Sequence, residues 1–141
     1  MREPLLVASG LSLLAAAVHG ILGETAIFHQ ARANPLPPFR LPRALRFLTL
    51  ATPAENSALH WAYLRASWHF PTLDFIVSTI LFGMAASSTS PALENVVRVT
   101  AVRYIAYAAA WLLIVAVRHR SVVGAPQWLL VLAIAGCALL G

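Results

Sequence analysis

The sequence predicts an all-α integral membrane protein: a four-helix bundle with a short interfacial amphipathic segment between its first and second helices. The chain has 141 residues, of which 60% are hydrophobic and only 11% are charged. A soluble domain is about 45–50% apolar and about 25% charged. Four apolar stretches are long enough to cross a bilayer, which takes roughly 20 residues. We therefore expect a single transmembrane domain over residues 1–141, with spans at about 4–23, 59–86, 96–117 and 121–140.

Three of these spans have recognisable helix starts. Thr52-Pro53-Ala54-Glu55 has the composition of a capping box with proline at the first helical position, so the second helix is expected to begin before the membrane. Ser90-Pro91 predicts the start of the third helix, and Pro126 suits the early turns of the fourth.

The longest connection, between the first and second spans, is rich in proline and arginine. Arg40, Arg43 and Arg46 recur at every third position and alternate with leucines. This pattern predicts a short segment lying flat against anionic lipid headgroups, and an ordinary basic loop is the alternative.

The arginines also predict the orientation of the chain. The first and third loops carry most of them, so the positive-inside rule places these loops in the cytoplasm and both termini outside. All ten basic residues are arginine, and alanine and leucine are abundant, which indicates a bacterial protein of the inner (cytoplasmic) membrane. A competing interpretation takes Ala15-Ala16-Ala17 as a signal-peptide cleavage site, which would leave three spans.

Four ionisable residues lie within or at the edge of the first two spans, where such residues often mark functional sites. Counted from the outer face, His19 and His69 lie about 22 and 25 Å deep, and Glu24 and Arg65 about 30 and 31 Å deep. Arg65 and His69 share a helix face because they are four residues apart. The sequence therefore predicts a histidine pair and a Glu–Arg pair near the cytoplasmic end of the first two helices.

Several kinds of chemistry suit these residues. His19 and His69 could ligate haem b or a transition metal, with Arg65 beside the cofactor and Glu24 as a third metal ligand or as the group that fixes a histidine tautomer. Without a metal, the same groups could pass protons. They could also only satisfy one another structurally, or take part in small-molecule chemistry. The pattern leaves these alternatives open.

A second ion pair is predicted between Asp74 on the second span and Arg103 on the third. Their depths are about 18 and 10 Å, a gap that a long arginine side chain can bridge. A buried aspartate needs a partner, and Tyr107 offers a second one. We expect this pair to specify the packing of the bundle.

Other functional classes have weaker support. Cys137 is the only cysteine, which excludes a disulfide within this sequence. The net charge of +5 is carried by arginines that flank apolar spans, so we expect a membrane surface and no nucleic acid as the partner. No nucleophile-and-base arrangement is recognisable, and enzymatic activity is left open. The alternative to an intramembrane site is a non-catalytic accessory subunit, docked to a membrane-protein partner or to further copies of itself.

The pattern His19-x3-Gly23-Glu24 followed by Arg65-x2-Trp68-His69 resembles small four-span membrane proteins of bacteria. The resemblance covers the first two spans, about half of the chain. It implies a helical bundle and carries no known activity.

Overall fold

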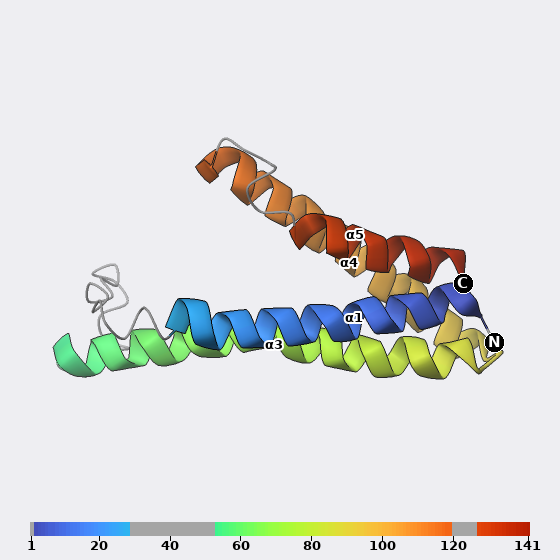
Figure 1. Cartoon of the computed structure of the whole chain (residues 1–141), viewed down its shortest axis with the longest axis horizontal. Coiled ribbons are helices and arrows are strands. Elements are labelled where there is room, and N and C mark those ends of the chain that lie inside the picture. The colour runs from blue at the N-terminus through green and yellow to red at the C-terminus, as the bar shows by residue number, and fades with distance from the viewer. Residues whose placement is uncertain (1, 29–52, 120–126) are drawn as a thin grey trace. The chain divides into compact units, whose positions relative to one another are not determined.

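The computed structural model describes residues 2–28, 53–119 and 127–141, and this part of the chain is entirely helical (Figure 1). The helices are α1 (Glu3–Leu22), α3 (Pro53–Ala86), α4 (Pro91–His119) and α5 (Gln127–Leu140), and a π-helical turn, η1 (Gly23–Phe28), continues α1. The predicted all-α class is confirmed. The predicted amphipathic segment with Arg40, Arg43 and Arg46 lies outside the described residues.

Three helical stretches are long and apolar enough to cross a membrane: Glu3–Thr25, Ala62–Ala86 and Pro91–Leu113. They correspond to the first three predicted spans. Helix α5 is also apolar but has 14 residues, or about 21 Å at 1.5 Å per residue, which is short of the roughly 30 Å hydrocarbon core. The first residues of the predicted fourth span lie outside the described part of the chain, so its full length stays a prediction.

Proline sets the starts of α3 and α4, as the sequence predicts. Pro53 and Pro91 are the first residues of these helices. A proline costs no hydrogen bond there, because the first amides of a helix have no carbonyl partner within it. Helix α3 also continues through Pro71, which cannot donate to the Ser67 carbonyl. Membrane helices tolerate such a proline when neighbouring groups compensate.

The chain divides into two compact units by its internal contacts. Unit 1 comprises Met1–Ala16 and Asp74–Gly141, and unit 2 comprises Ala17–Leu73. The boundary falls within α1 and α3, each of which contributes one part to each unit.

Unit 1 has a core of small and aromatic side chains. Alanines let the helix backbones approach closely, as is common where helices pack in membranes. The largest side chains that are fully buried are Tyr104 and Phe82. The core residues of α1, α3, α4 and α5 are Leu5, Ala8, Ala15, Ala16, Phe75, Phe82, Ala85, Ala86, Val97, Ala101, Tyr104, Ile134, Ala135 and Ala138.

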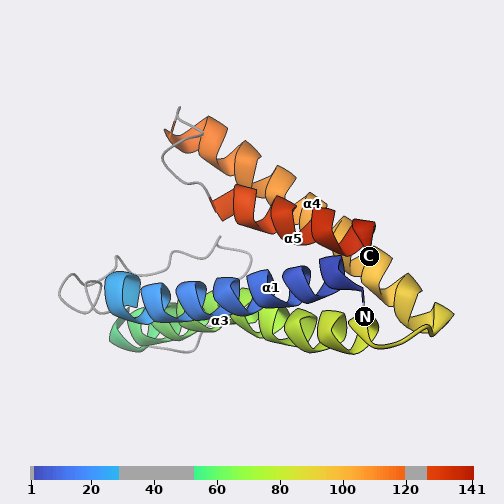
Figure 2. The ribbon, with the colours of Figure 1, turned by 45° about the vertical axis from the view of Figure 1, so that its right-hand side comes forward.

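Polar contacts connect the helices of unit 1. The Ser9 hydroxyl donates to the Thr79 carbonyl at 2.8 Å, which links α1 to α3. The Arg2 guanidinium lies 2.5 Å from a Glu94 carboxylate oxygen and links the start of α1 to α4. Helices α4 and α5 pack side by side, as both ribbon views show (Figures 1 and 2).

Many large hydrophobic side chains lie on the outward faces of these helices. Val99 is 70% exposed, and many other large hydrophobic side chains of α1, α3 and α4 are also exposed. Soluble monomers rarely expose apolar patches of this extent. Such a surface is typical of helices that contact lipid.

The core of unit 1 gives a first prediction. We expect Phe82→Ala to lower the free energy of unfolding by at least about 1 kcal/mol, because it removes dispersion contacts at a fully buried position. Met84→Ala is the matched control, two residues away on α3 and 60% exposed. In detergent, the melting temperature of Phe82→Ala should lie well below the melting temperatures of Met84→Ala and the wild type. Equal losses in the two variants would contradict this core.

Candidate functional site

The candidate site lies in unit 2, where the last turn of α1 and the turn η1 face α3. His19 belongs to α1 and Glu24 to η1. On α3 the residues Arg65, His69 and Thr72 follow one another at spacings of four and three, so they line one face of the helix.

The Glu24 carboxylate is the centre of the site. Arg65 holds it with two hydrogen bonds, from Nε to Oε1 at 2.8 Å and from Nη2 to Oε2 at 2.5 Å. This fork geometry gives a stronger and more directional contact than a single hydrogen bond. His69 Nε2 also lies 2.8 Å from Oε1. One carboxylate oxygen is therefore shared between a permanent cation and a histidine whose charge depends on protonation.

The three side chains of this cluster remain partly accessible. Their exposed fractions are 35% for Glu24, 48% for Arg65 and 37% for His69. A proton or a small polar molecule can therefore reach the cluster without displacing core side chains.

His19 is held by different neighbours. Its Nδ1 lies 2.9 Å from the Thr72 hydroxyl oxygen, and its ring stacks on the Trp68 indole with 4.2 Å between centroids and 10° between planes. The Trp68 Nε1–H donates to the His19 carbonyl oxygen at 3.0 Å. The ring of His19 is thus fixed in position and orientation by α3.

Gly23 of the His19-x3-Gly23-Glu24 pattern lies against the Trp68 ring of α3. It is buried, and a Cβ atom built on it would overlap the Trp68 indole ring. It is also the first residue of the π-helical turn that carries Glu24. Single π-helical turns are rare and frequently lie at functional sites. Gly23 therefore leaves space for the Trp68 ring next to His19 and begins the turn that carries Glu24.

The structure therefore brings the predicted residues together in a different combination from the one that depth alone suggested. Glu24 and Arg65, predicted at one level, form an ion pair, and His69 bonds to the same carboxylate. His19 Nδ1 bonds to the Thr72 hydroxyl, a partner that the depth count did not indicate. The sequence interpretation missed Thr72 and the stacking role of Trp68, although their spacing from Arg65 indicates the same face of α3.

The predicted metal ligands were His19, His69 and Glu24. Among the described residues, no three His, Cys, Asp or Glu side chains form a group that could hold a metal ion. Both oxygens of Glu24 are bonded to Arg65 or His69, and a metal cation there would meet the guanidinium charge. Haem or metal binding stays a prediction that this geometry does not favour.

Asp74 and Arg103 form a second polar cluster, within unit 1. Arg103 Nη2 lies 2.8 Å from Asp74 Oδ1 and 3.4 Å from the Ser78 hydroxyl oxygen. The guanidinium carbon also lies 5.5 Å from the ring centre of Tyr104 and 6.0 Å from that of Tyr107. The two residues predicted to pair are therefore in contact, and aromatic rings of α4 lie beside the cation.

Comparison with known proteins adds no identification to this geometry. No protein-family model matches the chain, and no curated protein or solved structure is significantly similar to it. The function is therefore argued from the site alone.

The contact between Gly23 and Trp68 gives a second prediction. We expect Gly23→Ala to lower the free energy of unfolding by about 1–3 kcal/mol, because the added methyl group must displace the indole ring. Gly10→Ala, on the same helix, is the control, since nothing lies within 4 Å of the added carbon. Melting temperatures of the two variants test this, and an unchanged value for Gly23→Ala would show that Trp68 lies elsewhere.

The second polar cluster gives a third prediction. Asp74→Asn should destabilise unit 1 by about 1–3 kcal/mol, because Arg103 then lacks its anionic partner in an apolar span. Tyr104→Phe should not lower stability, because the buried Tyr104 hydroxyl makes no well-aligned hydrogen bond with any described residue. Thermal unfolding of both variants checks this order, and the reverse order would contradict it.

Proposed function

We propose that this chain is a small multi-pass protein of the bacterial inner membrane and that unit 2 carries a proton-handling site built on Glu24, His69 and Arg65. The observation that carries the proposal is the position of one Glu24 carboxylate oxygen. This atom, Oε1, lies 2.8 Å from Arg65 Nε and 2.8 Å from His69 Nε2. A titratable carboxylate and imidazole in direct contact, on helices apolar enough to span a membrane, are the components of a proton relay.

The membrane part of the proposal rests on the three long apolar helices and their exposed hydrophobic faces. Its orientation rests on the arginine-rich first and third loops, which favour a cytoplasmic location for these loops and an outside location for both termini. With this orientation, the end of α1 that carries Glu24 faces the cytoplasm.

The proposed chemistry uses the chain's own residues. A proton on Nε2 of the His69 imidazolium passes to Oε1 of Glu24, which leaves a neutral imidazole and a carboxylic acid. The reverse transfer restores the ion pair. Arg65 keeps its charge throughout and orients the carboxylate through its two hydrogen bonds. His19 is fixed against Thr72 and Trp68 and is a further titratable group in the same unit.

Haem or metal binding is the alternative to proton transfer, and measurements on the purified protein distinguish the two. Ligation would require Glu24 or His69 to leave its present partner, whereas proton transfer uses the contacts already made. Absorption spectroscopy and metal analysis of the purified protein distinguish the two. A Soret band or a stoichiometric metal that is lost in both His19→Ala and His69→Ala would replace the proton proposal with a cofactor site.

The direct test, and a fourth prediction, is proton movement by the reconstituted protein. Purified protein is placed in vesicles that contain a pH-sensitive dye, and an imposed membrane potential drives protons. We expect Glu24→Gln to lower the rate on the order of tenfold or more, because the amide cannot accept the proton. His69→Ala should lower the rate as well.

Glu94→Gln is the matched control. Glu94 is also a carboxylate paired with an arginine, but it lies in unit 1. Its variant should keep the wild-type rate. Infrared spectra across acid and neutral pH supply a second readout, a carboxyl band that disappears in Glu24→Gln. A wild-type rate equal to that of protein-free vesicles, together with no band that depends on Glu24, overturns the proposal.

A further inference from the structure

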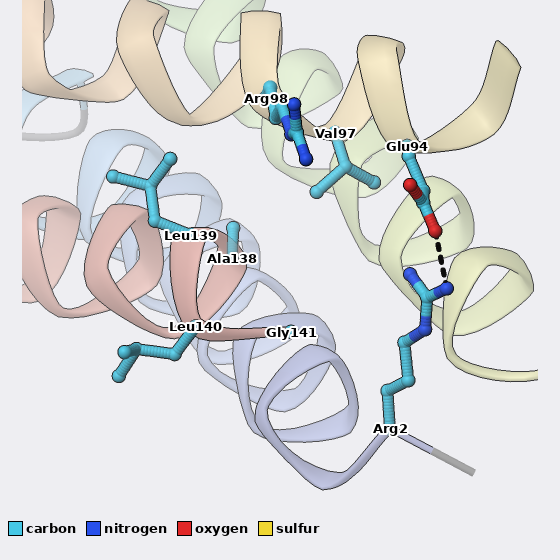
Figure 3. A pocket seen from close by; sticks show the side chains of 8 residues that line it. All are labelled: Arg2, Glu94, Val97, Arg98, Ala138, Leu139, Leu140 and Gly141. Carbon is cyan, nitrogen blue, oxygen red and sulfur yellow. Dashed lines mark hydrogen bonds and ion pairs between the residues drawn. The ribbon is translucent and has the colours of Figure 1, made fainter. Parts of the chain in front are cut away.

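A groove in unit 1 lies between the start of α1, the first turns of α4 and the last turn of α5 (Figure 3). Its volume is about 470 Å³, within the range of small-molecule sites. The residues that line it are Arg2, Glu94, Val97, Arg98, Ala138, Leu139, Leu140 and Gly141.

Two arginines and one glutamate line the groove. The Arg2 guanidinium and the Glu94 carboxylate form an ion pair. Arg98 is exposed and makes no hydrogen bond or ion pair with another residue in the described part of the chain. In Figure 3 its side chain extends from α4 into the groove, while Arg2 reaches toward Glu94. The exposed Arg98 guanidinium therefore has no hydrogen-bonding partner among the described residues.

The other side of the groove is apolar. Val97 on α4 and Leu139 and Leu140 on α5 contribute the hydrocarbon part of the lining. Arg98 is the eighth residue of α4, about 10 Å along the helix from its first residue. In a helix that spans a bilayer, this depth corresponds to the boundary between headgroups and acyl chains.

We propose that this groove binds the phosphate of an anionic phospholipid. Arg98 donates to the phosphate oxygens, Arg2 adds positive charge from the other side, and the leucines contact the glycerol and the first acyl carbons. The site differs from the basic first loop, which is expected to meet lipid headgroups at the opposite membrane face. It is also independent of the proton-handling site, because none of its residues belongs to unit 2.

The test, and a fifth prediction, measures lipid affinity in two variants with opposite expected effects. Purified protein in neutral detergent is titrated with phosphatidylglycerol or phosphatidylcholine, and bound lipid is counted by native mass spectrometry. Arg98→Gln should weaken phosphatidylglycerol binding roughly tenfold, as expected for the loss of a hydrogen bond to a charged group. Glu94→Gln should strengthen it, because Arg2 is released from its ion pair.

Two controls separate the lipid from other sources of phosphate and from effects on folding. Inorganic phosphate, at concentrations that would saturate a free-anion site, should not compete with phosphatidylglycerol. Arg98→Lys should retain most of the preference for the anionic lipid, because it keeps the charge. Competition by inorganic phosphate, or equal phosphatidylglycerol affinity in the wild type, Arg98→Gln and Glu94→Gln, would overturn the proposal. Proton movement by these variants is expected to match the wild type, so failure of this proposal is distinct from failure of the proposed function.

Discussion

A carboxylate on an apolar helix needs a compensating cation, and the contact of Glu24 with Arg65 and His69 is the clearest result of this constraint. Where such a helix crosses a bilayer, as we propose for α1 and α3, water solvates the charge poorly and the neighbouring helix supplies the partner. The described chain meets the constraint in three places: Glu24 with Arg65, Asp74 with Arg103, and Glu94 with Arg2. Each pair joins residues far apart in sequence and fixes how two helices face one another. The polar residues therefore specify packing that an alanine-rich, leucine-rich surface would leave open.

The sequence predicted the positions of residues along the helix axes and the starts of two helices. Helical rise is a fixed quantity, so counting residues from one membrane face placed Glu24 level with Arg65 and Asp74 within reach of Arg103. Proline has a defined place at the start of a helix, so Pro53 and Pro91 indicated the first residues of α3 and α4. The three long spans followed from apolar length alone. These predictions depend only on distance along a helix axis.

Rotation about the helix axis was not predictable in the same way. Depth placed His19 level with His69 and gave no indication that His19 bonds to Thr72 and stacks on Trp68. The direction of the Glu24 side chain depends on the π-helical turn η1 that carries it, and no sequence pattern indicated that η1 begins at Gly23. The requirement for glycine is also a three-dimensional one, since it depends on where the Trp68 ring lies. The sequence thus identified the ionisable residues of the site but not all of the residues that contact them.

The partners matter because the same residue type has different chemical consequences in different surroundings. Arg65 has both arms of its fork on one carboxylate, so its charge is largely compensated, and the variable charge of the cluster lies on Glu24 and His69. Such an arrangement suits the movement of a proton, since Glu24 and His69 are the two groups of the cluster that can gain or lose one. Arg98 makes no hydrogen bond or ion pair with a described residue, and its exposed guanidinium is available to groups outside the protein. The function of each arginine therefore follows from which charges around it are already balanced, and sequence position alone does not give that information.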